Sequence, residues 1–427
     1  MPQDVFDQLE WRGLVHQVTD PSLREQMKAE PFTLYCGFDP TAPSLTTAHL
    51  MQILSLRRMQ IAGHTPVAVA GGGTGLIGDP SFKESERPLL SKEEIESNVE
   101  QIRAQLARLL DFEAPNNAAL LVNNADWLTK LPLTDFLREV GKHFSVNTMI
   151  ARDSVRARLE DREQGISFTE FSYMLLQSYD FLHLFDSCGC RLQIGGSDQW
   201  GNIVAGADLI RRKRAVQAFG LTSPLIVRAD GKKMSKSEGG AVWLDGKQTS
   251  PYAFYQYWFN TADADVGTFL RYYTFLDSDE IEDLQEQVAT DPSARVAQRK
   301  LASEVTAMLH GEGEVEKAAK AAKAFFGEEI AGLDEKTLLD VLADAPSFEI
   351  ARSALGASPE ALVDIAVTCG LFPSKGAART DIQGGGFYLN NRRVIDPGYQ
   401  LSEVDLLQDR YLLLRRGKKT HLLVRLV

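Results

Sequence analysis

Hydrophobic and polar positions alternate in blocks along the first half of the chain, and the blocks predict strands and helices in turn. Short apolar runs at 32–38, 66–70, 118–122 and 191–194 have the length and the flanking turn residues of buried strands. Residues 45–62 and 92–110 repeat apolar positions at helical spacing, and Gly63 follows the first of these segments as a plausible cap. Strands that alternate with helices across short loops indicate a parallel sheet with right-handed crossovers.

The second half has a different pattern. Residues 250–327 are rich in Ala, Glu, Lys and Leu and are predicted to be almost wholly helical, and a linker containing Pro346 follows them. The last section combines the triple glycine 384–386 with a β-rich ending, which indicates a small α/β module. We therefore predict an α/β domain at 1–229, a loop and linker at 230–247, a helical domain with its linker at 248–350, and the small module at 351–427.

Composition places the chain among ordinary globular proteins. It has 427 residues, of which 44% are hydrophobic and 24% charged, and this size suits two or three domains. The N-terminus has no basic leader followed by an apolar run, and no uncharged apolar stretch of membrane-spanning length occurs, so we expect a cytoplasmic protein with no membrane segment. Cys188 and Cys190 have no second pair at ligand spacing, so we expect no metal site.

The charge is unevenly distributed. The net charge of −12 opposes indiscriminate binding to polyanions, whereas residues 351–427 hold 11 Lys and Arg against 7 Asp and Glu. This balance predicts a local polyanion site, with a merely solvated surface as the alternative. The cations proposed for it are Lys375, Arg379, Arg392, Arg393, Arg415, Arg416, Lys418 and Lys419.

Polar and glycine-rich segments follow three of the predicted strands. Asp39 follows the first, a window with five glycines (70–80) follows the second, and Gly196 with Asp198 follows the fourth. Ligands bind doubly wound folds at this carboxyl edge, so the segments predict a pocket, although ordinary loops would give the same local pattern. Within the glycine-rich window Asp79 can bind an ammonium group. Shortly after it, Lys83 and Arg87 are spaced to share a helical face and meet a phosphate.

A polar stripe runs along the otherwise apolar segment 168–180. Tyr173, Gln177 and Asp180 fall at i, i+4 and i+7, on one face of a helix. Buried polar groups are costly unless they are bonded, so the stripe is either a structural network or the wall of a polar ligand site.

A lysine-rich, glycine-flanked segment occupies residues 230–240. Its core is Lys233-Met234-Ser235-Lys236-Ser237. Such a segment predicts a loop that folds over a polyphosphate, because lysine supplies a compact positive charge; a solvated loop is the alternative.

Together, these segments resemble a class I aminoacyl-tRNA synthetase, and specifically the bacterial tyrosyl-tRNA synthetase family. The resemblance covers essentially the whole chain in order, through 35–41, 74–80, 193–202 and the Lys-Met-Ser-Lys-Ser loop. It implies a Rossmann-like catalytic domain, a helical domain and an S4-like RNA-binding domain. It also implies that tyrosine is activated with ATP to tyrosyl-adenylate and transferred to tRNA(Tyr), with Mg²⁺ held through the phosphates, in a homodimer.

The resemblance assigns roles to matching positions. Tyr35 and Asp180 match the pair that bonds the substrate phenol oxygen, and Asp79, Tyr173 and Gln177 match the group that holds its ammonium. The residues matching the adenylate and substrate site are Gly37, Asp39, Gly196, Asp198 and Gln199. The residues matching the pyrophosphate-stabilising set are Thr41, Lys83, Arg87, Lys233, Lys236 and Ser237.

One signature departs from the family pattern. Where the family has His-Ile-Gly-His, this chain has Thr46-Thr47-Ala48-His49, so only the second histidine is kept. Thr46 can donate a hydroxyl hydrogen bond to phosphate, but it cannot carry a positive charge. We expect adenylation to persist, with His49 and Thr46 in the site. The alternatives are an RNA-binding or regulatory paralogue that no longer activates an amino acid, and a synthetase for another aromatic amino acid.

Overall fold

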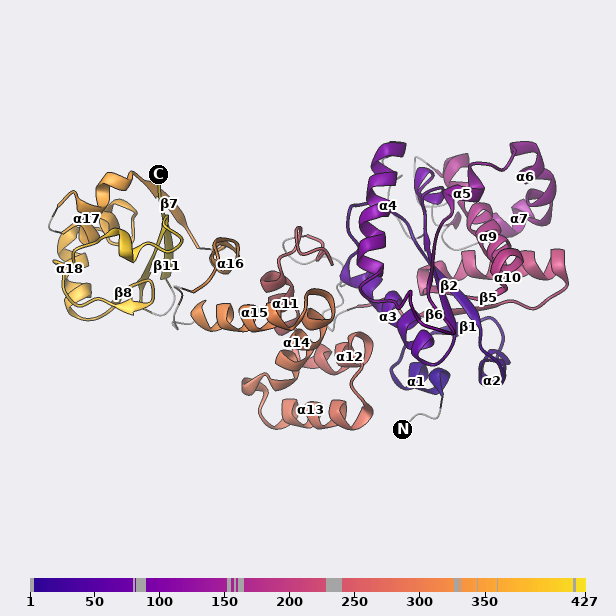
Figure 1. The fold of residues 1–427 in the computed structure, drawn as a ribbon, viewed down its shortest axis with the longest axis horizontal. Helices are drawn as coiled ribbons and strands as arrows, with labels where there is room; N and C mark the ends of the chain where they lie inside the picture. The colour runs from indigo at the N-terminus through magenta and orange to yellow at the C-terminus, as the bar shows by residue number, and fades with distance from the viewer. Residues whose placement is uncertain are drawn as a thin grey trace. The chain divides into compact units, whose positions relative to one another are not determined.

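The computed structural model describes residues 4–79, 81, 90–151, 155–156, 159, 165–227, 240–325, 330, 332–343, 345–358, 360–417 and 420–427. The chain forms two compact units (Figure 1). The N-terminal unit contains residues 1–249 and 260–309, and the C-terminal unit contains 250–259 and 310–427. The division into domains at 1–229, 248–350 and 351–427 stays a prediction.

The N-terminal unit is built on a six-stranded sheet in the order β1-β6-β5-β2-β3-β4. Its strands are β1 (Gln17–Val18), β2 (Thr33–Phe38), β3 (Thr65–Ala70), β4 (Leu120–Asn123), β5 (Cys190–Gly196) and β6 (Phe219–Ser223). Strands β2 to β6 run parallel, and only β1 pairs antiparallel, with β6. The predicted parallel sheet is therefore confirmed. The sequence analysis missed β1 and β6, because β1 has only two residues and the apolar run of β6 is broken by Gly220 and Thr222.

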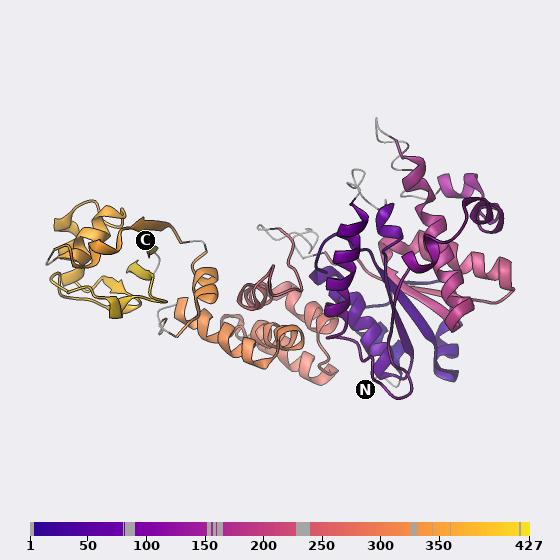
Figure 2. The same ribbon diagram turned by 45° about the horizontal axis from the view of Figure 1, so that its top comes forward.

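Helices cover both faces of this sheet. Figures 1 and 2 show α3 (Thr47–Ile61) and α4 (Lys92–Leu106) on one side, and α9 (Phe168–Cys188) and α10 (Trp200–Arg214) on the other. The start of α9 is marked by Ser167, whose hydroxyl accepts from the backbone N–H of Glu170, and its end by Gly189 at φ 66°. Because both faces are covered, the five residues of β3 from Pro66 to Ala70 are all buried.

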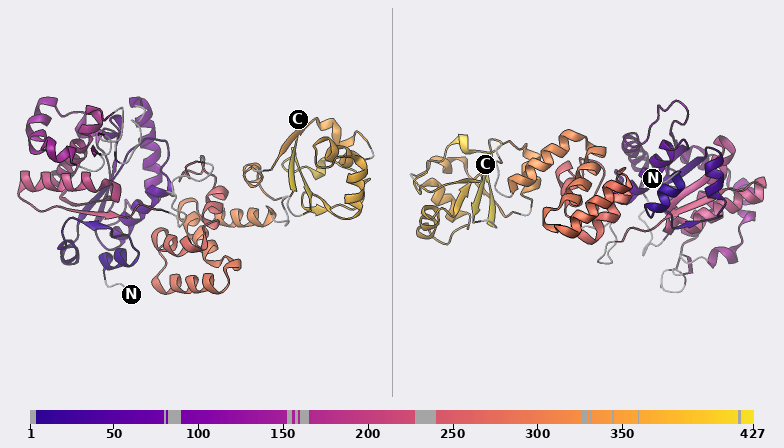
Figure 3. Two further views of the ribbon diagram at one scale, coloured as in Figure 1. Left: turned by 180° about the vertical axis from the view of Figure 1, so that it is seen from behind. Right: turned by 90° about the horizontal axis from the view of Figure 1, so that it is seen from below.

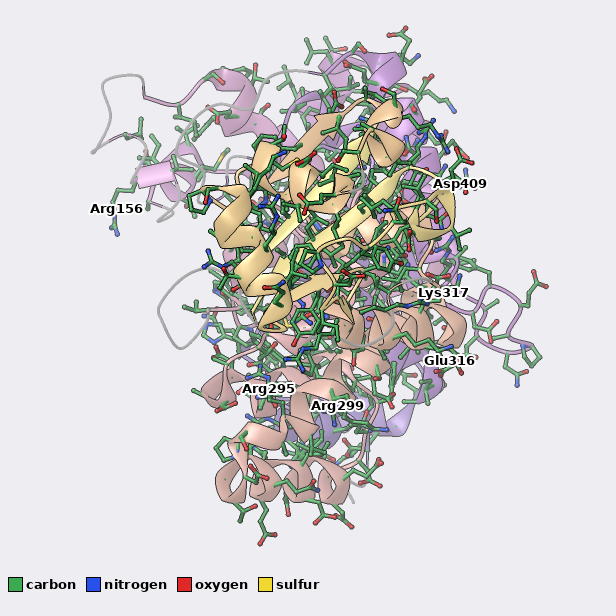
Figure 4. The ribbon with its side chains drawn as sticks, turned by 90° about the vertical axis from the view of Figure 1, so that its left-hand side faces the viewer. Arg156, Arg295, Arg299, Glu316, Lys317 and Asp409 are labelled. Carbon is green, nitrogen blue, oxygen red and sulfur yellow. The ribbon has the colours of Figure 1, made fainter. Side chains whose placement is uncertain are left out.

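The other helices of this unit are α1 (Val5–Trp11), α2 (Leu23–Ala29), α5 (Ala125–Leu128), α6 (Leu133–Glu139), α7 (Val146–Ile150), α12 (Asp263–Tyr273), α13 (Ser278–Thr290) and α14 (Val296–His310). Helix α14 begins after Arg295, which adopts a left-handed conformation and donates from its guanidinium to the Thr261 carbonyl. Figure 4 labels Arg295 and Arg299 on this first turn.

The C-terminal unit combines helices with a second sheet. Its helices are α11 (Pro251–Phe259), α15 (Glu312–Phe325), α16 (Glu335–Val341), α17 (Ala361–Thr368) and α18 (Lys375–Gln383). Its strands are β7 (Ser347–Ile350), β8 (Phe387–Leu389), β9 (Arg392–Arg393), β10 (Tyr411–Arg416) and β11 (Thr420–Leu426), in the order β7-β11-β10-β8-β9. Helices α17 and α18 pack on one face of the sheet over a continuous apolar core (Figure 3). Figure 4 looks onto this unit, with Glu316 and Lys317 marking α15. No helix among the described residues is long and apolar enough to cross a membrane.

Candidate active site

A cavity of about 480 Å³ opens at the carboxyl ends of the parallel strands in the N-terminal unit. Residues at or just beyond the ends of β2, β3, β5 and β6 line it, together with the start of α3 and one face of α9. This is the edge at which doubly wound sheets bind ligands. The predicted residues that line the cavity are Tyr35, Gly37, Asp39, Thr41, Thr46, His49, Asp79, Tyr173, Gln177, Asp180, Gly196, Asp198 and Gln199.

Five predicted site residues, Lys83, Arg87, Lys233, Lys236 and Ser237, lie outside the described residues. The described part of the site is the wall of the cavity. Its polar groups fall into three sets: one around Asp180, one around Asp79 and Asp39, and one at the start of α3.

The first set contains an unpartnered phenol. Tyr35 projects from the middle of β2, is buried, and packs its ring against Phe181 with 5.2 Å between ring centroids. Its hydroxyl is buried and has no hydrogen-bond partner among the residues that the structure describes. Burial, reinforced by the nearby negative charge of Asp180, raises the pKa of Tyr35 well above its ordinary value, so the hydroxyl keeps its proton and remains a donor.

Asp180 is a buried carboxyl held by two donors. Its Oδ2 accepts from Asn124 Nδ2 at 2.8 Å and its Oδ1 from Trp127 Nε1 at 2.7 Å. Burial raises the pKa of Asp180 to about 8, because it disfavours the charged form more than the two hydrogen bonds favour it. A carboxyl with this pKa, close to the buried Tyr35, is typical of a functional site.

The second set is a hydrogen-bonded group of side chains from four segments: α9 and the chain that follows β2, β3 and β5. Tyr173 on α9 donates to Asp39 Oδ2 at 2.8 Å, and Gln199 donates to Asp79 Oδ2 at 2.7 Å. Gln177 Nε2 lies 3.4 Å from Gln199 Oε1, while the Oε1 atom of Gln177 is buried without a partner. Two carboxylates and an unpartnered amide oxygen give a site that favours an ammonium group.

A short chain of hydrogen bonds joins these two sets, through residues that the sequence analysis did not select. Asn124 Nδ2 donates both to Asp180 and to Thr74 Oγ1, the latter at 2.9 Å, and Thr74 in turn donates to Asp39 Oδ1 at 2.8 Å. Gly71 makes this approach possible, because a Cβ there would collide with the Asp39 carboxylate. Asn124 lies just past the third predicted strand, and this position could have identified it as a candidate site residue.

The third set is the start of α3, where the family signature is altered. Thr46 is the N-cap residue, and its backbone N–H lies 3.0 Å from Nδ1 of His49. Its hydroxyl oxygen also lies 3.0 Å from that nitrogen. A backbone N–H can only donate, so Nδ1 is an acceptor and the neutral imidazole carries its proton on Nε2. The cavity-lining His49 is thus a donor held by Thr46.

The same N-cap segment is tied to the chain that follows the lysine-rich loop. Thr46 forms an antiparallel bridge with Trp243, and the N–H of Leu244 donates to the Leu45 carbonyl at 2.8 Å. The Thr47 N–H of the first turn donates to the Val242 carbonyl at 3.2 Å, while the dipole of α3 favours negative charge at this end of the helix. Among the described residues, no group of three or more His, Cys, Asp or Glu side chains is placed to hold a metal ion.

The cations predicted for polyanion binding lie in the C-terminal unit, and several have partners. Lys375 forms an ion pair with Asp364, and Arg379 with Glu360. Arg416 lies 4.9 Å above the Phe372 ring. Lys418 and Lys419 lie outside the described residues.

Two of these cations and one tyrosine form a row across the sheet. Tyr388 on β8 is paired in register with Arg393 on β9 and with Arg415 on β10. The Arg415 guanidinium lies 3.9 Å from the Tyr388 ring centroid. Arg393 donates from Nε to the Gly385 carbonyl at 2.7 Å, and Arg392 beside it on β9 is exposed. The row places positive charge and an aromatic ring on one face of the strands.

Two family models match the chain. Residues 27–327 match the family described as tRNA synthetases class I (W and Y). Residues 338–424 match the tyrosine–tRNA ligase SYY-like C-terminal domain.

Curated relatives match over nearly the whole length. The chain is 52% identical over 423 residues to a tyrosine–tRNA ligase of Roseiflexus castenholzii, and 51% identical over 424 residues to one of Geobacillus stearothermophilus, with 99% of each chain covered in both cases. Among solved structures, a C-terminally truncated mitochondrial tyrosyl-tRNA synthetase of Aspergillus nidulans aligns with a TM-score of 0.69 and 30% identity, covering 76% of this chain and 94% of that one. The chain belongs to the tyrosine–tRNA ligases, within the class I aminoacyl-tRNA synthetases.

Proposed function

We propose that this protein joins L-tyrosine to ATP, giving tyrosyl-adenylate and pyrophosphate, and then transfers the tyrosyl group to the terminal adenosine of tRNA(Tyr). The observation that carries the amino-acid specificity is the buried, unpartnered hydroxyl of Tyr35 in the cavity that Asp180 also lines. A substrate phenol can accept from Tyr35 and donate to Asp180, which satisfies both groups. A phenylalanine ring leaves the Tyr35 hydroxyl unpaired, at a cost of about 1–3 kcal/mol, and leaves Asp180 with only its two protein donors.

The ammonium group of the substrate belongs at the second set of side chains. Asp79, Tyr173 and Gln177 offer carboxylate, phenol and amide oxygens there, and the pair of Gln199 and Asp79 keeps the carboxylate oriented. With both ends of tyrosine fixed, its carboxylate is held for attack on the α-phosphate of ATP. This reaction depends on alignment and charge stabilisation more than on covalent help from the protein.

ATP belongs on the α3 side of the cavity. His49, held by Thr46, supplies an Nε2–H donor there, and the adenylate is proposed to lie along Gly37, Asp39, Gly196 and Asp198. Thr41 with Lys83, Arg87, Lys233, Lys236 and Ser237 is proposed to stabilise the departing pyrophosphate. Mg²⁺ would be held mainly through the ATP phosphates and would neutralise part of their charge.

The C-terminal unit is proposed to bind tRNA through an S4-like module at 351–427, with the helical part at 248–350 linking it to the catalytic domain. The exposed Arg392 and Arg393 beside the Tyr388 ring support this, since phosphate contacts and ring stacking are two means by which proteins hold RNA. Arg415 is buried and supports the Tyr388 ring. Substitution of the exposed Arg392 by Glu should raise the KM for tRNA(Tyr) and leave the ATP–pyrophosphate exchange rate unchanged.

A homodimer is proposed from an apolar face on the N-terminal unit. Helices α6, α7 and the start of α9 share one buried cluster, yet they leave several large apolar side chains exposed. These side chains are Leu133, Leu137, Val146, Ile150 and Phe168. A patch of this kind marks an interaction surface, and a second copy of the chain covers it most simply. A cytoplasmic location stays a prediction.

The decisive assay is tyrosine-dependent exchange of labelled pyrophosphate into ATP by the full-length protein. Exchange with tyrosine, and far slower exchange with phenylalanine or tryptophan, is the expected result. No exchange with any of the three would favour the paralogue that only binds RNA, and faster exchange with another aromatic amino acid would favour a synthetase for that substrate. Both relatives quoted above are named as ligases, which supports the first outcome.

A further inference from the structure

Both donors that hold Asp180 come from one short segment. Asn124 and Trp127 lie three residues apart, around helix α5. This helix has four residues, and none of them is buried. An isolated helix needs about 12–15 residues to be marginally stable in water, so α5 cannot hold its own position. Its start is anchored at Asn124, whose N–H donates to the Ala70 carbonyl at 3.0 Å and whose Oδ1 accepts from the Gly73 N–H at 2.7 Å. The orientation of the Trp127 indole is left to side-chain contacts.

The imidazole of His183 makes the closest ring contact to this segment. It stacks on the indole of Trp127 with 4.3 Å between ring centroids and 19° between ring planes. His183 follows Asp180 by three residues on α9, so the two side chains share one face of the helix. One helix therefore carries both the carboxyl and the ring that holds one of its donors.

The apolar core also supports the indole of Trp127. Trp127 packs against the buried cluster that contains Tyr35 and Phe181. With the cluster on one side and the imidazole stacked on it, the indole keeps a single orientation, with its N–H directed at Asp180 Oδ1. Asn124 and Asp180 line the cavity, whereas Trp127 and His183 are not among the described residues that line it.

We propose that His183 is a positioning residue for recognition of the substrate phenol. By stacking on Trp127 it keeps the indole donor on Asp180 and leaves the carboxyl oriented for the tyrosine hydroxyl. This inference rests on the proposed pairing of Asp180 with the substrate phenol. It predicts an effect on tyrosine that does not extend to ATP, because the proposed ATP contacts lie at the start of α3.

The test compares His183→Ala with His183→Phe in pyrophosphate exchange, with tyrosine and phenylalanine as substrates. Alanine removes the stack, and phenylalanine keeps a flat ring but removes the nitrogens. His183→Ala should raise the KM for tyrosine at least about 5-fold and lower the tyrosine-over-phenylalanine ratio of kcat/KM by a similar factor, with the KM for ATP within about 2-fold. His183→Phe should stay within about 2-fold of the wild type in all three quantities.

Phe185→Ala is the matched control, since it removes a half-buried ring from the same helix and the same cluster. Its KM for tyrosine should change less than about 2-fold. If His183→Ala does not fold, His183→Leu replaces it, because a branched chain keeps volume without stacking; the same losses are expected. An unchanged tyrosine KM in the alanine or leucine variant, or equal losses in His183→Phe or Phe185→Ala, would overturn the proposal.

Asp180→Asn, assayed in parallel, distinguishes a failure of the proposed role of His183 from a failure of the proposed phenol site. If it loses discrimination against phenylalanine while His183→Ala does not, only the role of His183 is wrong. If Asp180→Asn keeps full discrimination, the proposed phenol site itself is wrong.

Discussion

The backbone N–H of Thr46 and Nδ1 of His49 lie 3.0 Å apart, so the residue that replaces the first histidine of the family signature holds the second one in place. The hydrogen bond fixes the neutral ring with its proton on Nε2. What the replacement removes is a second imidazole donor on the phosphate side. The altered signature is therefore compatible with adenylation while lacking one of the usual contacts.

Restoring the family residues should speed the first step. The double variant Thr46→His, Ala48→Gly gains an imidazole and a bare backbone at the N-terminus of α3, where phosphate charge develops. We expect pyrophosphate exchange to rise by about 10-fold or the KM for ATP to fall by a similar factor. An unchanged rate and an unchanged KM for ATP would show that these positions do not limit the reaction. Thr46→Ser, which keeps both contacts to His49, should match the wild type.

The raised pKa of Asp180 has a consequence for stability. Since its pKa is about 8 in the folded protein and ordinary in the unfolded chain, the folded state binds its proton more tightly. Its contribution to the free energy of unfolding is therefore complete below pH 4 and is lost as the pH rises towards 8.

This loss can be measured against a variant that does not titrate. From pH 5.5 to pH 8 the free energy of unfolding of the wild type should fall relative to that of Asp180→Asn, by about 3 kcal/mol. Denaturant titrations at several pH values test this. A difference between the two proteins that stays constant over this range would mean that Asp180 titrates at an ordinary pKa.

Two buried arginines cap the end of α12. Arg12 donates to the carbonyls of Arg271, Thr274 and Leu276 at 2.6–3.1 Å, and burial lowers its pKa to about 10. Arg58 also donates to the Thr274 carbonyl, at 2.8 Å. Arg12→Met removes a buried donor from each of these carbonyls, of which those of Arg271 and Thr274 keep a donor from Arg58, and it should lower the free energy of unfolding by about 2–4 kcal/mol.

The matched control is Arg57→Met. Its side chain is partly exposed and lies 4.0 Å from the Asp111 carboxylate, so its loss should cost less than about 1 kcal/mol. Equal losses for the two variants, measured by denaturant unfolding, would contradict the capping role of Arg12.

The proposed dimer face can be tested at its most exposed aromatic residue. Phe168 has 79% of its surface exposed, and Phe168→Asp places a charge in the apolar patch. Sedimentation should show a dimer for the wild type and a shift towards monomer for the variant. Ile61→Asp introduces the same charge at a residue of α3 that is 64% exposed, and it should remain dimeric. A monomeric wild type, or the same shift in both variants, would contradict the assignment.

The sequence predicted the site best where the functional side chains recur at the spacing of a single helix or follow a strand directly. The stripe Tyr173–Gln177–Asp180 depends only on helical spacing, and the structure places all three side chains on the cavity wall. The polar residues that follow the parallel strands were predicted to line the cavity because ligands bind at the carboxyl edge of such a sheet. The spacing of Thr46 and His49 is also local and matches a capping pattern, so their contact was within reach of sequence reasoning.

Contacts between distant residues were not predictable in this way. Asn124 and Trp127 are polar or amphipathic residues in an ordinary-looking turn, and their roles depend on Asp180, more than 50 residues later in the chain. Arg58, near the end of a helix, has the sequence pattern of a solvated cation, but the carbonyls it caps belong to residues more than 200 positions away. Tertiary packing decides such contacts, and a single sequence does not carry that information.

The central claim is that this cavity recognises a phenol through Tyr35 and Asp180. The most direct measurement is the ratio of kcat/KM for tyrosine over phenylalanine in Tyr35→Phe, which removes only the unpartnered hydroxyl. We predict that this ratio falls by about 10-fold or more in Tyr35→Phe, while the KM for ATP is unchanged. A variant that discriminates between the two amino acids as well as the wild type does would contradict it.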